Sequence, residues 1–518
     1  MAFTMSVGEL IDADTTGLLA KHPSWERVRL SEVASILNGA PFDSALFDTT
    51  NGVPLVRIRD VLAGATSTYY KGEYEAANVV RPGDLLVGMD GDFNSGFWGA
   101  QTALLNQRVC RITPDERYFD KRLMAFLLPG YLAAINANTP SVTVKHLSSK
   151  TVGEIELPLP PFAEQARIVA KLEELLSDLD AGVAELKAAQ AKLAQYRQSL
   201  LKAAVSGELT TAWRREHPAT ETGADLLARI LRERLTRWEH QQRERYTAQG
   251  KPLPKNWQNK YPEPVPPDVT DLPELPQGWV WASLGQLVAE SSYGTSVKCS
   301  YEARGCPVLR IPNVSGSKLN LHDMKFATQE LQLAADEYLE TGDVLVIRTN
   351  GSIGLVGRAA PVTSALPRPH YFASYLLRLR CMEKVYLHRW MVTVMLSGYG
   401  RRWIETRAAS SAGQHNISLS TLLTMPVPLP ALDEQCAGLA LLDDAQEQVA
   451  DQQSAITHAL AQAGAQRQNL LRAAFAGELV PQDPRDEPAI ALLARIRAER
   501  AAQGAVQKPR GRKTKEAV

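Results

Sequence analysis

Residues 164–204 read EQARIVAKLEELLSDLDAGVAELKAAQAKLAQYRQSLLKAA, and a leucine recurs in them every seven positions. Such a heptad repeat is typical of a long helix that packs against another helix. Leu175, Leu176 and Val183 fill the intervening half-turns. The predicted seam residues are Leu172, Leu179, Leu186, Leu193 and Leu200. This helix therefore needs a partner.

The chain contains a matching helix 270 positions further on. Glu164-Gln165 matches Glu434-Gln435, and LLKAA at 200–204 matches LLRAA at 470–474. A constant offset between such matches indicates an internal duplication. The second set of seam residues is Leu442, Val449, Ile456, Ala463 and Leu470. We expect the two helices to form an antiparallel coiled coil within the chain; dimerisation of two chains is the alternative.

Both predicted helices begin and end alike. Pro158–Pro161 precedes the first and Pro428–Pro430 the second, and proline before an acidic first turn favours a helix start. Gly207 and Gly477, each followed by Glu-Leu, end them. A helix of about forty residues is roughly 60 Å long. Such a pair can hold two domains at a fixed separation.

Bulk composition indicates a folded protein of several domains. At 518 residues the chain is too long for one hydrophobic core. Its 57 Lys and Arg balance 57 Asp and Glu, so total charge does not predict a nucleic-acid partner. The sequence shows neither a membrane span nor a secretion signal, and five scattered cysteines are typical of reduced thiols. We expect a cytoplasmic location and no membrane contact.

A second duplication lies outside the helices. PLVRIRDV at 54–61 recurs as PVLRIPNV at 307–314, and RPGDLLV at 81–87 recurs as ETGDVLV at 340–346. Short alternating strands mixed with helical stretches predict two α+β domains. The predicted segments are an N-terminal extension (1–22), a first α+β domain (23–160), a first coiled-coil helix (161–207), a charged helix with a Pro-rich linker (208–275), a second α+β domain (276–430), a second coiled-coil helix (431–477), and a C-terminal helix with a basic tail (478–518).

Local patterns refine this organisation. In the first domain we expect one half-buried strand over 104–112 and two helical stretches, at 121–128 and 131–136. Between the domains, LLARI at 226–230 has an echo at 492–496, so the duplication extends past both coiled-coil helices. The basic tail at 508–515 is expected to be solvated, with phosphate attraction as the alternative.

Motifs for catalysis are missing from the sequence. Leu159-Pro-Pro-Phe162 lacks the polar side chain with which adenine methyltransferases hold the amino group. No phosphate-binding Gly-rich loop occurs, and no two histidines have local metal-ligand spacing. We therefore predict a binding protein, with no catalytic residues, metal site or cofactor of its own.

Duplication and a rigid spacer suit duplex DNA. Dimeric DNA-binding proteins contact half-sites about one helical turn, roughly 34 Å, or a multiple apart. Residues 277–430 contain fifteen Lys and Arg against ten Asp and Glu, whereas 21–160 contain fourteen against fifteen. Because the two domains differ almost everywhere outside their framework, an asymmetric, bipartite DNA target is expected, with much of the phosphate contact supplied by other subunits.

This pattern resembles the specificity subunits of Type I restriction-modification systems, used in phage defence. The resemblance covers 23–210 and 276–480 and is carried by the Pro-rich turns, the paired Glu-Gln helix starts and the Gly-Glu-Leu ends. It implies a non-catalytic subunit that binds double-stranded DNA and scaffolds two modification subunits and restriction subunits, with 23–160 and 276–430 as its two target-recognition domains. The partners would methylate adenine with S-adenosylmethionine and cleave DNA with ATP and Mg.

Candidate DNA contacts are polar residues near predicted strand ends, since Arg, Lys, Asn and Gln recognise base edges and phosphates. They are Arg57, Arg59, Asn94, Lys145 and His146 in the first domain, and Arg310, Asn313, Arg348, Asn350 and His415 in the second. Asn94 and the segment 348–351 are placed in loops that differ between the copies. A structural or phosphate role is an equal alternative for the matched pair Arg57 and Arg310.

Two other kinds of protein fit parts of the sequence. A coiled-coil scaffold with two peptide-binding domains would explain the neutral charge and would not bind DNA. A self-sufficient modification enzyme would methylate DNA as a single purified chain.

Overall fold

The computed structural model describes residues 6–99, 101–139, 145–218 and 220–506. The basic tail expected at 508–515 lies outside these residues. The chain divides into two compact units, Met1–Lys187 with Thr457–Val518 and Ala188–Ile456. The first unit therefore combines two segments that are distant in sequence, whereas the second is continuous.

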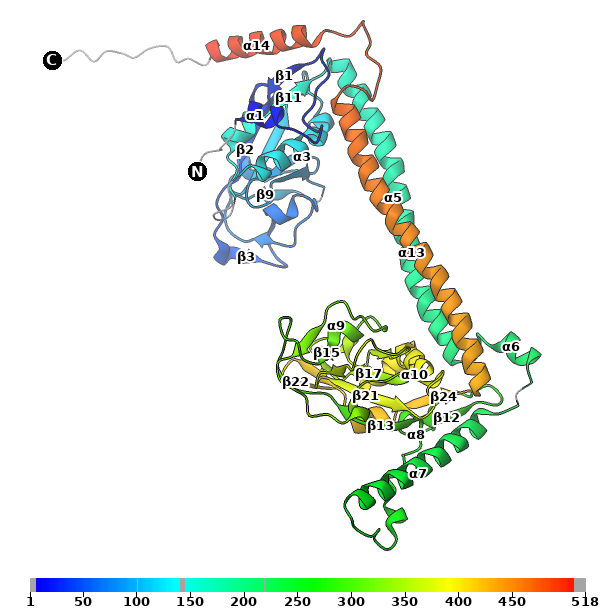
Figure 1. Ribbon diagram of the computed structural model, residues 1–518. Coiled ribbons are helices and arrows are strands. Elements are labelled where there is room, and N and C mark those ends of the chain that lie inside the picture. Colours follow the sequence, from blue (N-terminus) through cyan, green and yellow to red (C-terminus); the bar gives the residue numbers. More distant parts are fainter. Residues whose placement is uncertain (1–5, 100, 140–144, 219, 507–518) are drawn as a thin grey trace, which may run out of the picture. The chain divides into compact units, whose positions relative to one another are not determined.

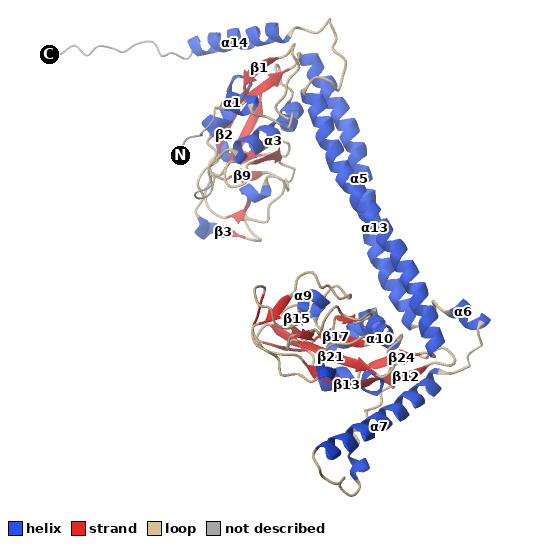
Figure 2. Ribbon diagram, in the orientation of Figure 1, coloured by secondary structure: helices blue, strands red, loops and turns tan. Residues whose placement is uncertain are grey.

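Two 44-residue helices, α5 (Phe162–Val205) and α13 (Leu432–Phe475), pass through both units (Figures 1 and 2). In the first unit the start of α5 pairs with the end of α13, where Arg467 forms an ion pair with Asp180. In the second unit the end of α5 pairs with the start of α13, where leucines of both helices form one buried cluster. The helices are therefore an antiparallel pair.

The seam residues of both helices are shielded from solvent. Leu172, Leu200, Leu442 and Val449 are buried. The half-buried seam positions are Leu179, Leu186, Leu193, Ile456, Ala463 and Leu470. Because a single helix of this length would expose such a stripe to water, apolar burial along the seam stabilises the pair.

Both long helices are followed by a glycine in the left-handed region. Gly207 and Gly477 each have a φ of 75°, a conformation that favours glycine. A Cβ at Gly207 would lie 2.6 Å from Pro276, and one at Gly477 would lie 2.6 Å from His22. The two glycines therefore also let the chain pass close to the start of an α+β domain.

The α+β domain of the first unit is built on three sheets in its described residues. A four-stranded sheet has the order β2-β10-β7-β8, a five-stranded sheet has the order β3-β5-β4-β9-β6, and β1 pairs with β11. The strands are β1 Glu26–Arg29, β2 Ala34–Asn38, β3 Phe47–Asp48, β4 Val53–Val56, β5 Tyr69–Tyr70, β6 Val79–Val80, β7 Leu85–Gly88, β8 Asn94–Phe97, β9 Ala103–Leu105, β10 Val109–Pro114 and β11 Glu156–Leu159.

The α+β domain of the second unit repeats part of this topology. Its sheets have the orders β13-β21-β17-β19, β14-β16-β15-β20, β18-β23-β22 and β12-β24. The strands are β12 Val280–Ser283, β13 Val288–Tyr293, β14 Cys299–Ser300, β15 Pro307–Leu309, β16 Lys325–Ala327, β17 Asp343–Ile347, β18 Thr349–Asn350, β19 Ala359–Pro361, β20 Tyr371–Phe372, β21 Leu376–Cys381, β22 Ala409–Ser411, β23 Gln414–Asn416 and β24 Pro426–Leu429.

Helices cover the sheets of both domains. In the first domain α3 (Lys121–Ala137) shares a buried core with β7 and β10. In the second, α10 (Leu387–Leu396) and α11 (Gly398–Arg407) share a core with β17 and β21. The shorter helices are α1 Val7–Asp12, α2 Leu30–Val33, α4 Ser149–Gly153, α6 Thr211–Glu216, α8 Leu284–Leu287, α9 Ile311–Val314 and α12 Leu419–Leu423.

Two local expectations for the first domain were wrong. The single strand expected over 104–112 is two strands, β9 and β10, because Val109 N donates to Asn106 O in a tight turn between them. The two helical stretches expected at 121–128 and 131–136 are one helix, α3, which continues through Pro129. Seven buried apolar side chains of α3 hold it in place despite the hydrogen bond that proline removes.

The duplicated LLARI segments form helices that pack in different units. In α7 (Gly223–Ala248), Leu226 and Ile230 are buried in the core of the second domain. In α14 (Ala489–Val506), Leu492 and Ile496 are buried in the core of the first domain.

Across the described residues, no helix combines the length and apolarity that a membrane crossing requires.

A buried hydrogen bond joins each α+β domain to the start of a long helix. In the first unit Trp25 Nε1 donates to Glu164 Oε2 at 3.0 Å, and in the second Trp279 Nε1 donates to Glu434 Oε2 at 2.9 Å. The glutamine that follows each glutamate donates to a proline carbonyl five residues before it, at 3.0 Å in both units. The duplicated Glu-Gln pair therefore fixes the angle at which each domain meets its helix.

Replacing Glu434 with alanine should destabilise the second unit. The change leaves the buried Trp279 Nε1 without an acceptor and removes the ionic partner of Arg214. An unsatisfied buried donor costs about 1–3 kcal/mol. Denaturant unfolding of the full chain measures the change, and Glu434→Gln, which keeps an amide oxygen for Trp279, should recover part of it. A loss below about 0.5 kcal/mol, typical of ordinary surface substitutions, would contradict the structural role of this bond.

One buried histidine lacks partners in the second domain. His388 in α10 is 2% exposed, and neither ring nitrogen has a hydrogen-bond partner among the described residues. Burial lowers its pKa from 6.5, and the charges that act on it are those of Glu383, Arg389 and Asp343. The folded state therefore holds His388 neutral at a pH where the unfolded chain begins to bind a proton.

This burial predicts a loss of stability in acid. The pKa of His388 is lower in the folded chain than in the unfolded one, so protonation favours unfolding. Neutral His388 therefore makes its full contribution to the free energy of unfolding above about pH 6.5. That contribution decreases as the pH falls toward the folded pKa. His388→Phe should remove that part of the pH dependence. Urea midpoints at pH 7.5 and 5.5 for both proteins measure it, and equal acid sensitivity in the two would refute the assignment.

Candidate nucleic-acid interface

A three-stranded sheet in the second domain brings three of the candidate residues together. Asn350 in β18 pairs with His415 in β23. Arg348, immediately before β18, donates from Nε to Asn416 Oδ1 at 3.3 Å. Ile417 N donates to Arg348 O at 2.9 Å and continues the ladder. Arg348, Asn350 and His415 therefore form one polar cluster, although they are 67 positions apart at the extremes.

This sheet replaces the loop expected at 348–351. The pairing partner of β18 lies after α10 and α11, so the sequence around Arg348 gives no sign of it. The Arg348 guanidinium lies 5.0 Å from the centroid of the Tyr293 ring, which holds it by a cation–π contact. Ordered arginines of this kind are pre-organised for phosphate or base contacts.

The electrostatics around this sheet favour a polyanion. Segments 344–382 and 406–432, which contain β18, β22 and β23, contain no Asp or Glu. Arg348 directly precedes β18, and Arg407 lies two residues before β22. Arg348 forms no ion pair with another described residue, so its charge remains available to an external phosphate. Arg407 instead interacts electrostatically with the Asp268 carboxylate.

The corresponding place in the first domain has different chemistry. Leu147 N donates to Met89 O at 2.7 Å, matching the bond between Ile417 and Arg348. Here Asp90 and His146 form a β-bridge, and His146 Nδ1 lies 2.5 Å from Asp90 Oδ1. Arg108 also forms an ion pair with Asp90. A carboxylate therefore occupies a position that Thr349 has in the second domain.

Lys145 and Asn94 are also held by neighbouring groups. Lys145 Nζ donates to the backbone and side-chain oxygens of Asn136 at 2.6 and 3.0 Å. Asn94 was expected in a loop, but it begins β8 and pairs with Gly88. Its Nδ2 donates to Asp92 O at 3.1 Å, and its buried Oδ1 has no partner among the described residues.

Arg57 and Arg310 occupy matching positions in the repeated segments 54–61 and 307–314. In each domain the residue begins a tight turn after a strand. Arg57 N donates to Asp60 Oδ2 at 2.9 Å, and Arg310 N donates to Asn313 Oδ1 at 2.8 Å. Asn313 is 1% exposed, and its Nδ2 donates to two backbone oxygens. This geometry gives Asn313 a structural role in the turn.

The arginine side chains of these turns differ in availability. Arg310 forms an ion pair with Asp323 at 2.9 Å. Arg59 is largely exposed, with a contact from Nη2 to Thr68 Oγ1 at 3.4 Å and an ion pair to Asp60 at 3.8 Å. Arg57 is half-buried at the end of β4. Of these three guanidinium groups, that of Arg59 is the most open to an external phosphate.

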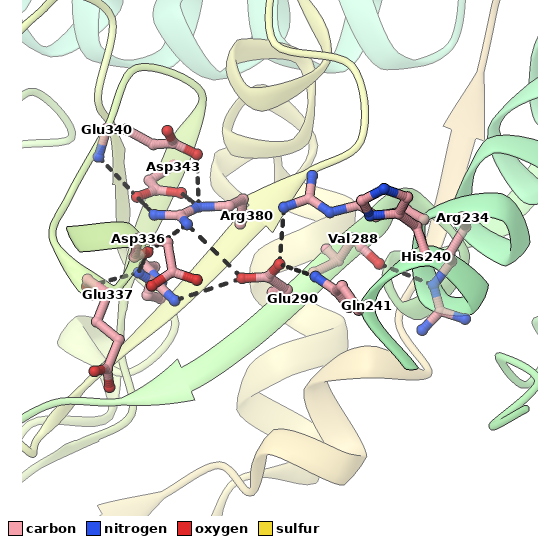
Figure 3. Close-up of polar contacts among 12 residues, drawn as sticks. Arg234, His240, Gln241, Val288, Glu290, Asp336, Glu337, Glu340, Asp343 and Arg380 are labelled. Carbon is pink, nitrogen blue, oxygen red and sulfur yellow. Dashed lines mark hydrogen bonds and ion pairs between the residues drawn. The ribbon is translucent and has the colours of Figure 1, made fainter. Parts of the chain in front are cut away.

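Sequence patterns missed an ionic network that supports the second domain (Figure 3). Glu290 in β13 accepts from Arg237 and Gln241 of α7 at 2.8 and 3.2 Å. Arg380, which is 2% exposed, lies 3.7 Å from Glu290 and donates to Asp343 Oδ1 at 2.8 Å. The network therefore attaches α7 to the sheet whose strand β17 leads into Arg348. The only sequence signal is a pair of arginines, at 378 and 380, in an otherwise apolar strand.

Comparison with known proteins identifies this architecture. The sequence model of the Type I restriction modification DNA specificity domain matches residues 23–188. The Type I restriction enzyme EcoBI specificity subunit of Escherichia coli is 32% identical over 519 residues, covering 97% of this chain and 98% of that protein. The chain belongs to the family of Type I restriction-modification specificity subunits.

More distant relatives align with most of the length of this specificity subunit. The EcoKI specificity subunit of Escherichia coli K12 is 24% identical, and the StySPI specificity subunit of Salmonella potsdam is 22% identical; each alignment covers 93% of this chain and 96% of the relative. A solved chain of a type I R-M system is 19% identical with a TM-score of 0.57, covering 88% of this chain and 98% of that one. The last comparison supports the fold alone.

Family membership implies that this specificity subunit recognises DNA sequence, as expected. Specificity subunits are the non-catalytic components of Type I systems. Within the described residues, no group of three or more His, Cys, Asp or Glu side chains is placed to hold a metal ion.

Proposed function

We propose that this specificity subunit binds an asymmetric, bipartite duplex DNA target, with one part contacted by each α+β domain. The single observation that carries the proposal is the contrast at equivalent strand ends of the duplicated domains. Arg348 and Thr349 stand in the second domain where Met89 and Asp90 stand in the first. Because the framework repeats while these polar groups change, the two domains would recognise different bases.

The helix pair would set the distance between the two parts of the target. Each domain is attached to its helix by a buried Trp–Glu hydrogen bond and by a Gln–Pro carbonyl bond. A change in helix length would therefore be transmitted to the domains. If each domain were attached flexibly to its helix, the protein would accept many gap lengths between the two parts of the target.

The catalytic steps would belong to partner subunits that this chain assembles. Modification subunits would supply S-adenosylmethionine chemistry, and restriction subunits would supply ATP- and Mg-dependent cleavage. This chain would contribute sequence recognition and the attachment surfaces.

Mapping adenine methylation in the host genome with and without the gene tests the proposed function. One interrupted motif should lose methylation when the gene is removed. Unchanged methylation in a host that expresses the modification subunits would refute it.

Arg348→Ala should weaken or relax recognition of one part of the target only. The change removes a guanidinium held over Tyr293 beside the three-stranded sheet of the second domain. Loss of one good bidentate base contact corresponds to about 1–3 kcal/mol of discrimination. Gel shifts on duplexes with either half scrambled measure the effect, and Arg485→Ala, outside both α+β domains, is the control. Equal loss of preference for both halves would contradict the assignment.

Removing one heptad from each long helix should shorten the preferred gap. Deletion of 181–187 and 457–463 preserves the seam register and shortens the pair by about 10 Å. With about 3.4 Å per base pair, the gap should decrease by about three base pairs. Binding to duplexes with a series of spacer lengths measures the shift. An unchanged optimum in a folded variant would rule out the helix pair as the element that sets the gap.

A further inference from the structure

Two strands of the three-stranded sheet that contains Asn350 and His415 form an exposed hairpin. Its strands β22 and β23 are joined by Ala412 and Gly413, which have φ values of 49° and 75°. Positive φ at both central residues is typical of the tight type I′ turn, whose twist matches that of the two strands. Figure 1 shows β22 at the edge of the second domain. The hairpin, residues 409–416, is therefore a short ribbon with a defined tip.

The base of the hairpin is anchored in the domain. β23 pairs with β18 on one side and β22 on the other. Ile417, the next residue, is fully buried and donates to Arg348 O at 2.9 Å. On the other strand, the Arg407 guanidinium lies 4.6 Å from the centroid of the Trp403 ring at the end of α11. The ribbon is thus held at both strands, and its exposed tip lies beside Gly351, where an added Cβ would be 3.6 Å from Gln414 Nε2.

The polar side chains at the tip of the hairpin are exposed and make no hydrogen bonds with other described residues. Residues 409–414 are all exposed. The side chains of Ser410, Ser411 and Gln414 form no hydrogen bond with another described residue. In the adjacent strand Asn350 Oδ1, by contrast, accepts from Ser352 N at 2.8 Å. Ser411 and Gln414 are directly paired, so both side chains lie on the same face next to the turn.

The charge around the hairpin suits a polyanionic partner. Residues 406–432 contain no Asp or Glu, and neither does 344–382, which supplies β18. Arg348 and Arg407 lie at the base of the hairpin, and Asp268 of the linker is a carboxylate that interacts electrostatically with Arg407. A two-stranded ribbon with basic residues at its base and free amide and hydroxyl groups at its tip has the shape and chemistry that fit the major groove.

We propose that the hairpin 409–416 enters the major groove of one half of the DNA target and that Gln414 contacts a base edge there. The glutamine amide presents a donor and an acceptor side by side, which match the N6 and N7 groups of adenine. Arg348 and Arg407 at the base then lie toward the phosphates that border the groove. This inference rests on the proposed function and assigns Gln414 as a specificity-determining residue beyond the candidates found in the sequence.

The test uses the full chain expressed with its modification subunits. Methylation motifs are mapped for the wild type, for Gln414→Ala, and for Gln258→Ala, an exposed glutamine of the linker that serves as the matched control. Gln414→Ala should reduce discrimination at one base position of one half by about 10- to 100-fold. The other half and the gap should stay unchanged, and Gln258→Ala should give the wild-type motif.

Two outcomes would overturn the inference while leaving the proposed function intact. An unchanged motif for Gln414→Ala would show that the hairpin does not contact the recognised bases. A uniform loss of binding with an unchanged motif, measured by gel shift over a salt series, would show that Gln414 contacts the backbone alone. If the wild type itself produced no interrupted motif, the proposed function would fail, and this inference with it.

Discussion

The hydrogen bond between a domain tryptophan and the first-turn glutamate of a long helix is the contact on which this architecture depends. It is made twice, by Trp25 with Glu164 and by Trp279 with Glu434. Burial raises the pKa of the Glu164 carboxyl, and the indole donor and Gln482 oppose that shift. Apolar residues of the long helices, such as Ile168 and Leu439, also lie in the domain cores. The buried Trp–Glu bonds add direction to this packing, because a hydrogen bond depends on orientation and apolar contact does not.

The two long helices were predictable because heptad spacing and repeated short motifs are visible in the sequence itself. Heptad leucines such as Leu172 and Leu200 are shielded along the helix pair, and the Glu-Gln pairs begin the long helices. The role of the glutamate was beyond sequence reasoning, since Trp25 lies 139 residues away. In the same way, the turn at Asn106 and the continuous helix through Pro129 depend on tertiary packing that short windows of sequence do not contain.

The candidate interface was predictable only in part. Arg348 and His415 are brought into one sheet, although the pairing that joins them crosses two intervening helices. Asn313 proved to be a buried turn residue, because its amide satisfies backbone groups that nothing in the local sequence identifies. Gln414 was overlooked because an isolated glutamine has no pattern; its exposure and lack of partners appear only once the hairpin is formed.

The discontinuity of the first unit has a consequence for the order in which the protein is made. The second unit, Ala188–Ile456, is one uninterrupted segment, whereas the first needs Thr457–Val518 to complete its core around Phe475 and Ile496. At synthesis rates of about 5–20 residues per second, the amino-terminal segment waits roughly 15–60 s for its missing helices. The second unit can therefore complete its fold before the first. The amino-terminal domain can bury all of its apolar surface only after the carboxy-terminal segment has been translated.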